Sequence, residues 1–476
     1  MSSYDLIVIG AGPGGYISAI KAAQLKKKVA LIEKNEVGGT CLNQGCVPTK
    51  TLIHSAELVR TLTHSEELGI VVSGVNVDFD ALFERKNTVV AKLRQGIESL
   101  LKANRVDYYS GSCSFIVDGA RKEKMHEDCL GTVTVMVGDK VLSSDHVLIA
   151  TGATPAKPPI KGIDLEGVIT SYELLKEGKA YQHLVIIGGG VIGVEFATIY
   201  NSLGSKVTII ESMDRLLPNM DREISQNLSL ILKKRGVDIY TGAKVNEIEK
   251  NESLICHFTD KTDDKQIKAD GILIATGRRA NTSNLNLDAI NLPTVRGHIQ
   301  VSEHFETSVP NVYAIGDVIL GGIQLAHVAS AQGINAVAKM FGEPTPYNLD
   351  AVPSCIYTSP EIATVGLTAD EAKAKGIPIL QGKALMSANC KSVIENADRG
   401  FIKLIFEAEH QILIGAQLMC THATDIIGEL CTAVANRLTA RQLASVIRPH
   451  PTFCEAVGEA IEDALGESIH AMPKRI

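Results

Sequence analysis

The sequence has no long run of basic residues. The longest is the triplet Lys26–Lys28, and the formal net charge of the chain is −7. Proteins that bind nucleic acid usually carry a basic patch, so this balance argues against such a partner. Long apolar runs are missing as well, because Gly and Glu interrupt each of them well before the roughly 20 residues that a membrane-spanning helix needs. We therefore expect neither nucleic-acid binding nor a membrane span.

Signals for export and for zinc binding are also missing. A strand pattern begins almost at once, at Tyr4, and leaves no room for a signal or transit peptide. The ten cysteines form no CxxC pair and no Cys/His cluster with zinc spacing. We therefore expect a cytoplasmic protein without a metal site, in which most cysteines are reduced and buried. Cys41 and Cys46, with four residues between them, are the exception.

Two segments share the pattern of a dinucleotide-binding unit: a strand, a glycine-rich turn, a helix and a second strand. They begin at Tyr4 and Leu184 and end in the acids Glu33 and Glu211, and the first glycine precedes the acid by 23 positions in both (33 − 10 and 211 − 188). The glycines permit close approach of a pyrophosphate to the helix N-terminus, and the acid accepts a hydrogen bond from a ribose hydroxyl. These glycines are Gly10, Gly12 and Gly15 in the first unit and Gly188, Gly190 and Gly193 in the second.

Two later apolar runs resemble each other and look like the strands that close these two domains. They are VLIATG, which ends in Thr151 and Gly152, and ILIATG, which ends in Gly277. A third segment, TSVPNVYAIGD, brings Asp317 to the carboxyl end of a strand, where it can bond a polar ligand. The chain is therefore expected to bind two dinucleotides.

The positions of the two units indicate which ligand each one holds. The first unit lies directly upstream of Cys41 and Cys46, so its dinucleotide is interpreted as a flavin, which can accept two electrons from a dithiol and pass a hydride to NAD. In the second unit Glu211 favours NAD, because a carboxylate would repel the 2′-phosphate of NADP. Arg215 lies four residues further on and is interpreted as a surface residue.

Cys41 and Cys46 are interpreted as a catalytic disulfide. Residues five apart in a regular helix are separated by about 7.5 Å along the axis, whereas a disulfide needs Cα atoms within about 7 Å. The segment must therefore be irregular, which Gly45 permits and Pro48 reinforces. A structural staple is the weaker interpretation, because so small a loop removes little entropy from the unfolded chain. Lys50 follows and can favour an anionic flavin or a thiolate.

A thiol reaction also needs a base, and the segment RPHPTFCEA near the C-terminus offers one. His450 stands between two prolines that make it rigid, and Glu455 follows five residues later. The carboxylate can orient the imidazole and raise its pKa, which makes the histidine a better base.

Together these motifs, with GGTCLNQGCVPTK and YTSPEIATVG, resemble the pyridine nucleotide–disulfide oxidoreductases from about Tyr4 to Glu459. The resemblance implies an α/β protein with two doubly wound nucleotide-binding domains and an α+β C-terminal dimerisation domain. It divides the chain into an FAD-binding domain at 1–150, an NAD-binding domain at 151–280, a central domain at 281–348 that completes the FAD site, and a dimerisation domain at 349–476.

The resemblance also implies a homodimeric enzyme that oxidises a protein-bound dihydrolipoyl group and reduces NAD through tightly bound FAD. Its partner would be a lipoylated acyltransferase or the carrier protein of a glycine-cleavage system, because this chain contains no lipoyl domain. Cys46 would lie against the flavin, Cys41 would exchange with the substrate, and His450, supported by Glu455, would act as base across the dimer interface. Further expected contacts are Thr40, Lys50, Gly111, Glu195 and Ala326 for FAD, and Val245 for NAD.

The sequence departs from the family pattern at a few positions. Gln44 lies between the two thiols, where a small apolar residue is usual, and Arg448 replaces a common His. Cys454 and Gln332 replace a common Ser and a common Glu. The alternative interpretation is a glutathione reductase-like NAD(P)H–disulfide reductase with the same thiols and base. Glu211 argues against it, because such an enzyme prefers NADP.

Overall fold

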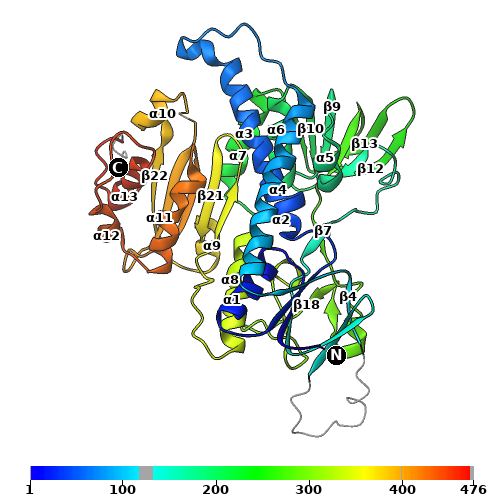
Figure 1. The fold of residues 1–476 in the computed structure, drawn as a ribbon. Coiled ribbons are helices and arrows are strands. Elements are labelled where there is room, and N and C mark those ends of the chain that lie inside the picture. Colours follow the sequence, from blue (N-terminus) through cyan, green and yellow to red (C-terminus); the bar gives the residue numbers. More distant parts are fainter. Residues whose placement is uncertain (1, 117–131, 398, 472–476) are drawn as a thin grey trace.

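The computed structural model of the protein describes residues 2–116, 132–397 and 399–471. Figure 1 shows an N-terminal unit at the bottom, a second strand-and-helix unit at the upper right and a C-terminal part in orange and red at the left. Helices α3 (Cys46–Thr63) and α4 (Phe79–Ala103) run between these parts and pack against each other. Helix α3 also packs on α6 (Val191–Ser202), so a helix of the first unit contributes to the core of the second.

The N-terminal unit is built on a sheet of strand order β3-β2-β1-β6-β5-β4, with β19 paired to β6. Strand β1 reads as a continuous apolar run because it is central and parallel to both neighbours, so Leu6, Ile7 and Val8 are fully buried. Helix α1 (Pro13–Gln24) begins with proline directly after the glycine turn, where no N–H is needed. The strands are β1 (Ser2–Ile9), β2 (Val29–Glu33), β3 (Asp107–Ser110), β4 (Cys113–Phe115), β5 (Val133–Val137), β6 (Lys140–Ile149) and β19 (Val312–Ala314).

The second unit repeats this plan with a parallel sheet of order β11-β10-β9-β15-β8. A three-stranded antiparallel sheet follows β11 along the chain. The parallel strands are β8 (Val168–Thr170), β9 (His183–Ile187), β10 (Lys206–Glu211), β11 (Asp238–Thr241) and β15 (Gly271–Ile274), with helices α5 (Ser171–Glu177), α6 and α7 (Arg222–Lys234). The antiparallel strands are β12 (Ala243–Lys250), β13 (Leu254–Asp260) and β14 (Asp263–Ala269).

Two short strands, β7 (Ala153–Pro155) and β16 (Arg278–Ala280), pair where the chain passes between the units. The segment that follows, 281–348, packs on the N-terminal unit. Its hairpin β17–β18 (Thr294–Val295 and His298–Ile299) precedes β19, which joins the first sheet, and its helix α8 (Ala326–Met340) packs on α1. The expected division of the chain into four domains stays a prediction.

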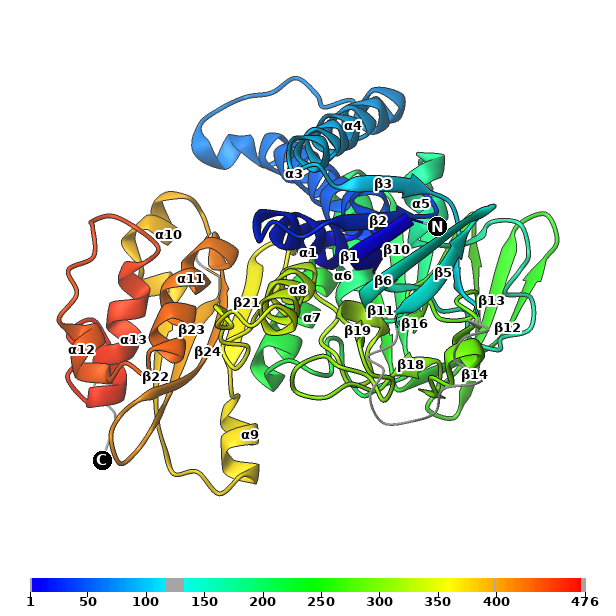
Figure 2. The ribbon, with the colours of Figure 1, turned by 60° about the horizontal axis from the view of Figure 1, so that its bottom comes forward.

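The C-terminal part is an antiparallel sheet of order β20-β21-β24-β23-β22 with helices packed on it (Figure 2). Helix α11 lies against β21 and β24, and α13 lies against β22. The strands are β20 (Pro353–Ile356), β21 (Glu361–Gly366), β22 (Ile379–Leu385), β23 (Phe401–Glu407) and β24 (Leu413–Cys420). The helices are α9 (Ala369–Ala374), α10 (Cys390–Ile394), α11 (Ala423–Ala435), α12 (Ala440–Ala444) and α13 (Glu455–Leu465).

These observations confirm the predicted fold class, with two nucleotide-binding units and an α+β C-terminal part. Among the described residues, no helix is long and apolar enough to cross a membrane.

Ion pairs of the buried Lys403 connect the second unit to the C-terminal sheet. Lys403 Nζ lies 3.0 Å from Asp221 Oδ1 and 2.9 Å from Glu223 Oε2.

Candidate functional site

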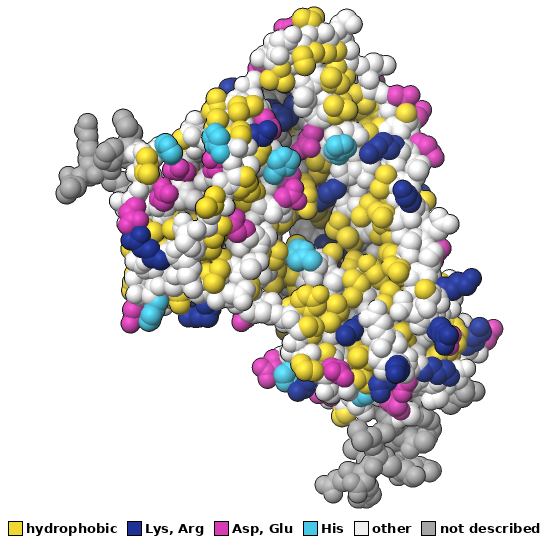
Figure 3. Space-filling view, turned by 60° about the vertical axis from the view of Figure 1, so that its left-hand side comes forward, with side chains coloured by type: hydrophobic (Ala, Val, Ile, Leu, Met, Phe, Trp, Pro, Cys, Tyr) yellow, Lys and Arg dark blue, Asp and Glu magenta, His cyan; other side chains and the backbone are white. Residues whose placement is uncertain are grey.

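A cleft of about 1660 Å³ lies between the two units and the C-terminal part. Figure 3 shows a hollow with hydrophobic side chains beside it on this face of the molecule. Ligand pockets usually measure about 300–1,000 Å³, so this cleft has room for more than one ligand of that class. It brings together most of the predicted site residues: Gly10, Gly12, Glu33, Thr40, Cys41, Cys46, Lys50, Thr151, Gly152, Gly188, Gly190, Glu195, Glu211, Val245, Gly277, Asp317 and Ala326.

The two glycine turns have the same geometry in both units. Gly10 and Gly188 have φ values of +102° and +114°, and a Cβ at either position would lie 2.4 Å from a carbonyl oxygen. Gly15 and Gly193 do not line the cleft. A Cβ there would lie 1.8 Å from the Gly10 oxygen and 2.0 Å from the Gly188 oxygen, so these glycines allow the helix to pack closely on its strand.

The N-termini of both helices point their unpaired N–H groups towards the cleft. The N-caps of α1 and α6 are Gly12 and Gly190, and neither offers a side chain to the first-turn N–H groups. A Cβ at Gly190, Gly152 or Gly277 would meet nothing within 4 Å, so a ligand can approach the backbone there. This arrangement fits the diphosphates of two dinucleotides, which bind at helix N-termini.

The two predicted acids are held in the same way. Glu33 accepts hydrogen bonds from the Ala11 N–H at 2.7 Å and the Asn35 N–H at 2.8 Å. Glu211 accepts from the Gly189 N–H at 2.5 Å and the Met213 N–H at 2.7 Å. Both carboxylates are thus fixed at the cleft. Glu211 Oε1 also accepts from the Ser212 hydroxyl at 3.2 Å, so Glu211 Oε2 and both oxygens of Glu33 retain a lone pair for a ribose hydroxyl.

Arg215 does not line the cleft. Its guanidinium donates to the Pro218 carbonyl oxygen at 2.6 Å. No positive charge from Arg215 therefore offsets the carboxylate of Glu211, and the preference predicted for NAD rests on that carboxylate.

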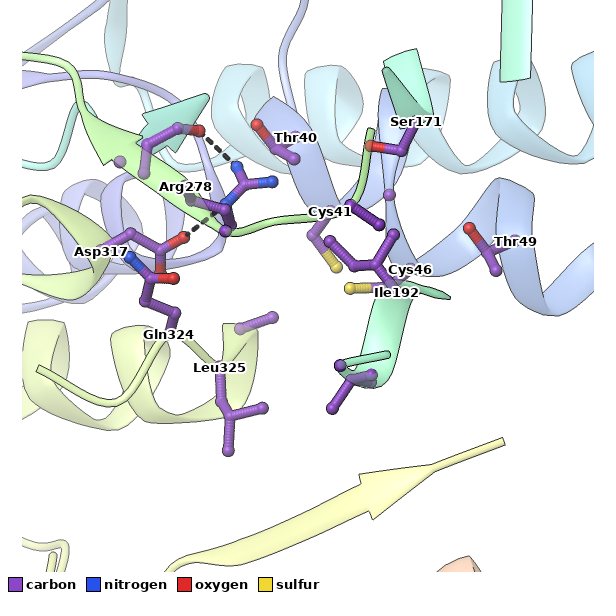
Figure 4. A pocket seen from close by; sticks show the side chains of 18 of the residues that line it. Thr40, Cys41, Cys46, Thr49, Ser171, Ile192, Arg278, Asp317, Gln324 and Leu325 are labelled. Carbon is purple, nitrogen blue, oxygen red and sulfur yellow. Dashed lines mark hydrogen bonds and ion pairs between the residues drawn. The ribbon is translucent and has the colours of Figure 1, made fainter. Parts of the chain in front are cut away.

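The thiols lie on either side of a break between two helices. Cys41 is in α2 (Gly39–Gln44), Cys46 is the first residue of α3, and Gly45 between them has φ −150° and ψ −111°, far from helical values. The sulfur atoms lie side by side (Figure 4). This agrees with the predicted irregular segment, but both cysteines are free thiols in the structure, so it shows the dithiol form of the pair.

The two thiols differ in acidity. The pKa of Cys46 is lowered to about 7, first because the Cys41 thiol donates a hydrogen bond to it and further because Lys50 lies nearby, while burial opposes this effect. The pKa of Cys41 is raised, because its proton is held in that hydrogen bond and its side chain is partly buried. Cys46 is therefore the thiol that carries negative charge near neutral pH.

Lys50 joins all three parts of the molecule at the thiols. Its ammonium lies 2.9 and 2.7 Å from the two carboxylate oxygens of Glu195 in α6. That buried carboxylate also accepts the Tyr357 N–H at 3.0 Å, and the Lys50 ammonium lies 4.6 Å from the centre of the Tyr357 ring. The resemblance had placed Lys50 and Glu195 at the flavin, and the structure brings them together beside Cys46.

Asp317 has a partner that the sequence did not reveal. Arg278 Nε lies 3.5 Å from Asp317 Oδ2 (Figure 4). Burial raises the pKa of Asp317, and Arg278 opposes this rise. The side chain of Gln332 accepts a hydrogen bond from the Gly316 N–H at 2.8 Å, so it fixes the turn that precedes Asp317. Ala326 begins α8 and adds a third helix N-terminus at the cleft.

The predicted base lies outside the cleft. His450 Nδ1 is 2.8 Å from Glu455 Oε1, and the His450 side chain is 68% exposed. Partial burial pushes the pKa of Glu455 upwards, but hydrogen bonds from the Thr452 N–H and from His450 outweigh it, so that pKa is lowered. Because Glu455 accepts a hydrogen bond from the Nδ1–H of His450, Nε2 is left free to accept a proton. Within one chain the structure does not bring this pair to the thiols.

Gly111, a predicted FAD contact, also lies outside the main cleft. Its N–H donates to the Glu33 carbonyl oxygen at 2.8 Å, and it lines a smaller cavity of about 510 Å³ next to the first sheet. Of the unusual residues, Gln44 is exposed at the cleft, whereas the buried guanidinium of Arg448 lies 2.5 Å from the partly exposed carboxylate of Glu429. Cys454 packs against the C-terminal core and has a raised pKa because of burial, which fits an inert thiol.

Comparison with known families accounts for nearly the whole chain. Residues 4–333 match the pyridine nucleotide-disulphide oxidoreductases, and residues 352–461 match the dimerisation domain of that family. A dihydrolipoyl dehydrogenase of Bacillus subtilis is 39% identical, with 98% of this chain and 99% of that protein covered. A dihydrolipoyl dehydrogenase of Geobacillus stearothermophilus is 38% identical, with 99% and 98% covered.

Solved structures show the same similarity in space. LpdA from Mycobacterium tuberculosis superimposes with a TM-score of 0.87 at 26% identity, over 97% of this chain and 99% of that chain. The HOCl-induced flavoprotein disulfide reductase RclA from Escherichia coli superimposes with a TM-score of 0.84 at 30% identity, over 96% and 99%.

Proposed function

Because this chain belongs to the pyridine nucleotide-disulphide oxidoreductase family, we propose that it oxidises a protein-bound dihydrolipoyl group and reduces NAD, as a dihydrolipoyl dehydrogenase does. The observation that carries the proposal is the thiol pair beside Lys50 in a cleft that both dinucleotide-binding units share. Full-length relatives that are dihydrolipoyl dehydrogenases support the substrate. The lipoyl group would belong to an acyltransferase or to a glycine-cleavage carrier protein, and a cytoplasmic location stays a prediction.

The residues present fit FAD in the first unit and NAD in the second. A bound flavin supplies an acceptor for two electrons from the dithiol and a hydride donor for NAD. The residues proposed to hold FAD are Gly10, Gly12, Gly15, Glu33, Thr40, Lys50, Thr151, Gly152, Glu195, Asp317 and Ala326, with Gly111 near Glu33. Those proposed to hold NAD are Gly188, Gly190, Gly193, Glu211, Val245 and Gly277.

The thiols are proposed to react by exchange, starting from the Cys41–Cys46 disulfide. One thiolate of the dihydrolipoyl group attacks the Cys41 sulfur, which forms a mixed disulfide and releases Cys46 as a thiolate. The second substrate thiolate then attacks the substrate sulfur of that mixed disulfide, so the lipoyl disulfide forms and Cys41 leaves and takes up a proton. The lowered pKa of Cys46 makes it a good leaving group in the first step.

A base must take the protons of the dihydrolipoyl group. His450 is exposed and outside the cleft, so we propose that His450 of a second copy of the chain performs this role in a homodimer. Its Nε2 would accept the proton while Glu455 holds Nδ1 and stabilises the imidazolium that forms. The dimerisation domain at residues 352–461 supports this arrangement.

The alternative is an NAD(P)H-driven disulfide reductase, and RclA, which has a similar structure, is a flavoprotein disulfide reductase. Steady-state rates with dihydrolipoamide and NAD, and with glutathione disulfide and NADPH, distinguish these two functions. We expect FAD-loaded protein to oxidise dihydrolipoamide with NAD much faster than with NADP. Reduction of glutathione disulfide by NADPH, without turnover of dihydrolipoamide, would overturn the proposal and support the alternative.

A further inference from the structure

Tyr172 reaches from the second unit to the helix that carries Cys41. It lies in α5, and its hydroxyl is 2.7 Å from the hydroxyl of Thr40, the residue directly before Cys41. Helices α2 and α5 pack against each other at this point. Tyr172 also lines the cleft, so this contact lies within the proposed cofactor site.

The same phenol oxygen contacts a cation on its other side. Arg278 Nη2 lies 3.3 Å from the Tyr172 oxygen and also donates to the Ala153 carbonyl oxygen. The other side of that guanidinium pairs with Asp317. Tyr172 is therefore the link between Thr40 in the first unit and Arg278 on β16.

Thr40 lies at the phosphate end of the first dinucleotide site. It follows Gly39, whose backbone packs so closely on the glycine turn that a Cβ there would lie 2.6 Å from the Gly12 Cα. Gly12 is the N-cap of α1, where the diphosphate of a dinucleotide binds. Thr40 therefore directly follows a residue that packs on the diphosphate turn, and it lines the same cleft as Gly12.

The donor and acceptor chemistry gives this chain of contacts a direction. Arginine can only donate, so the Tyr172 oxygen accepts from Arg278. The Tyr172 proton has two acceptors in reach, the Thr40 oxygen at 2.7 Å and the Ala153 carbonyl oxygen at 3.5 Å, and the shorter contact favours Thr40 because Arg278 already donates to Ala153. The proton of Thr40 is then free to point at an acceptor in the cleft. A hydrogen bond to an anionic oxygen is stronger than one between neutral groups, and consecutive hydrogen bonds reinforce one another.

We infer that Tyr172 is a positioning residue for FAD, whose phenol orients the Thr40 hydroxyl as a donor to the diphosphate. The inference rests on the proposed binding of FAD by the first unit. It adds to that proposal a residue contributed by the second unit, so the flavin site includes a hydroxyl from the domain that binds NAD.

The test measures FAD binding to the apo-protein by the change in flavin fluorescence. Tyr172→Phe removes one oxygen and should weaken FAD binding by about three- to ten-fold, the effect of one hydrogen bond. Tyr347→Phe changes an exposed tyrosine outside the cleft and should leave FAD binding unchanged. If Tyr172→Phe bound FAD as tightly as the unmodified protein, the inference would be wrong.

A double-mutant cycle with Thr40→Val tests whether the two hydroxyls act as one unit. Thr40→Val should weaken FAD binding, and adding Tyr172→Phe should weaken it by less than about two-fold more. If the double variant lost FAD affinity by the product of the two single losses, the hydroxyls would act independently and the inference would be wrong. An equal loss of NAD affinity in Tyr172→Phe would also overturn it, because it would indicate a general disturbance of the fold. Failure of the unmodified protein to bind FAD would instead overturn the proposed function.

Discussion

The Lys50 ammonium lies 2.7 Å from a carboxylate oxygen of Glu195, and this ion pair joins the thiol helix to the second dinucleotide-binding unit. Both charges act on Cys46 with opposite sign, since Lys50 lowers the pKa of that thiol and Glu195 raises it. The electrostatic balance at the reactive sulfur is therefore set jointly by two units far apart in the sequence.

Two neutralising substitutions should move the pKa of Cys46 in opposite directions. Lys50→Met should raise it above the value of about 7, because the thiolate loses its cation, and Glu195→Gln should lower it. The thiolate forms above the pKa, so its ultraviolet absorbance in the reduced apo-protein should be lost at a higher pH in Lys50→Met and at a lower pH in Glu195→Gln. Shifts in the same direction would contradict this account.

The assignment of Cys46 to the flavin side can be checked by its absorption. A thiolate beside an oxidised flavin gives a long-wavelength band, and reduction of FAD-loaded protein by two electrons should produce it. Cys41→Ser leaves Cys46 in place, with Lys50 and a hydroxyl donor beside it, and should keep the band near neutral pH. Cys46→Ser should abolish it. A band that survives in Cys46→Ser and vanishes in Cys41→Ser would reverse the two roles.

The position of His450 leads to a prediction about subunits. His450→Ala should slow dihydrolipoamide oxidation by about 10²- to 10⁴-fold, the usual contribution of a general base, while FAD stays bound. His410→Ala is the matched control, because His410 is also exposed and paired with a glutamate, and this substitution should leave the rate unchanged.

Mixed dimers decide whether the base acts across the interface. A dimer of one Cys41→Ser chain and one His450→Ala chain contains one complete site only if the histidine serves the thiols of the other chain. Mixing the two inactive proteins under conditions that exchange subunits should therefore restore activity. Mixtures that stay inactive, although mixed dimers form, would place the histidine and the thiols of one site in the same chain.

The sequence predicted those parts of the site that depend on local patterns. The glycine turns and the acids Glu33 and Glu211 follow from short spacings, and the break at Gly45 follows from the length of a helix turn. Arg278 and Tyr172 were missed, because their roles depend on contacts between elements more than 100 residues apart and no motif marks them. The sequence also suggested a disulfide between Cys41 and Cys46, whereas the structure contains both residues as thiols.

The ion pair between Lys403 and Asp221 should contribute strongly to the attachment of the second unit. Lys403 is 6% exposed, and Lys403→Met would leave the buried Asp221 carboxylate without a cation, whereas Glu223 would keep its ion pair with Lys383. Loss of one partner of a buried pair costs about 3–5 kcal/mol of unfolding free energy. Lys391→Met removes a more exposed helix pair with Glu395 and should cost less than about 0.5 kcal/mol.

Urea unfolding of the apo-proteins, followed by circular dichroism, measures both effects.

The same ion pair should also affect NAD binding. Asp221 is the N-cap of α7, and the loop between Glu211 and this cap contains Pro218 and Asn219, which line the cleft. Lys403→Met should therefore raise the dissociation constant of NAD more than that of FAD, and Lys403→Arg, which keeps the charge, should restore most of the loss. Equal weakening of both cofactors would show that the ion pair supports the whole fold and not the NAD loop in particular.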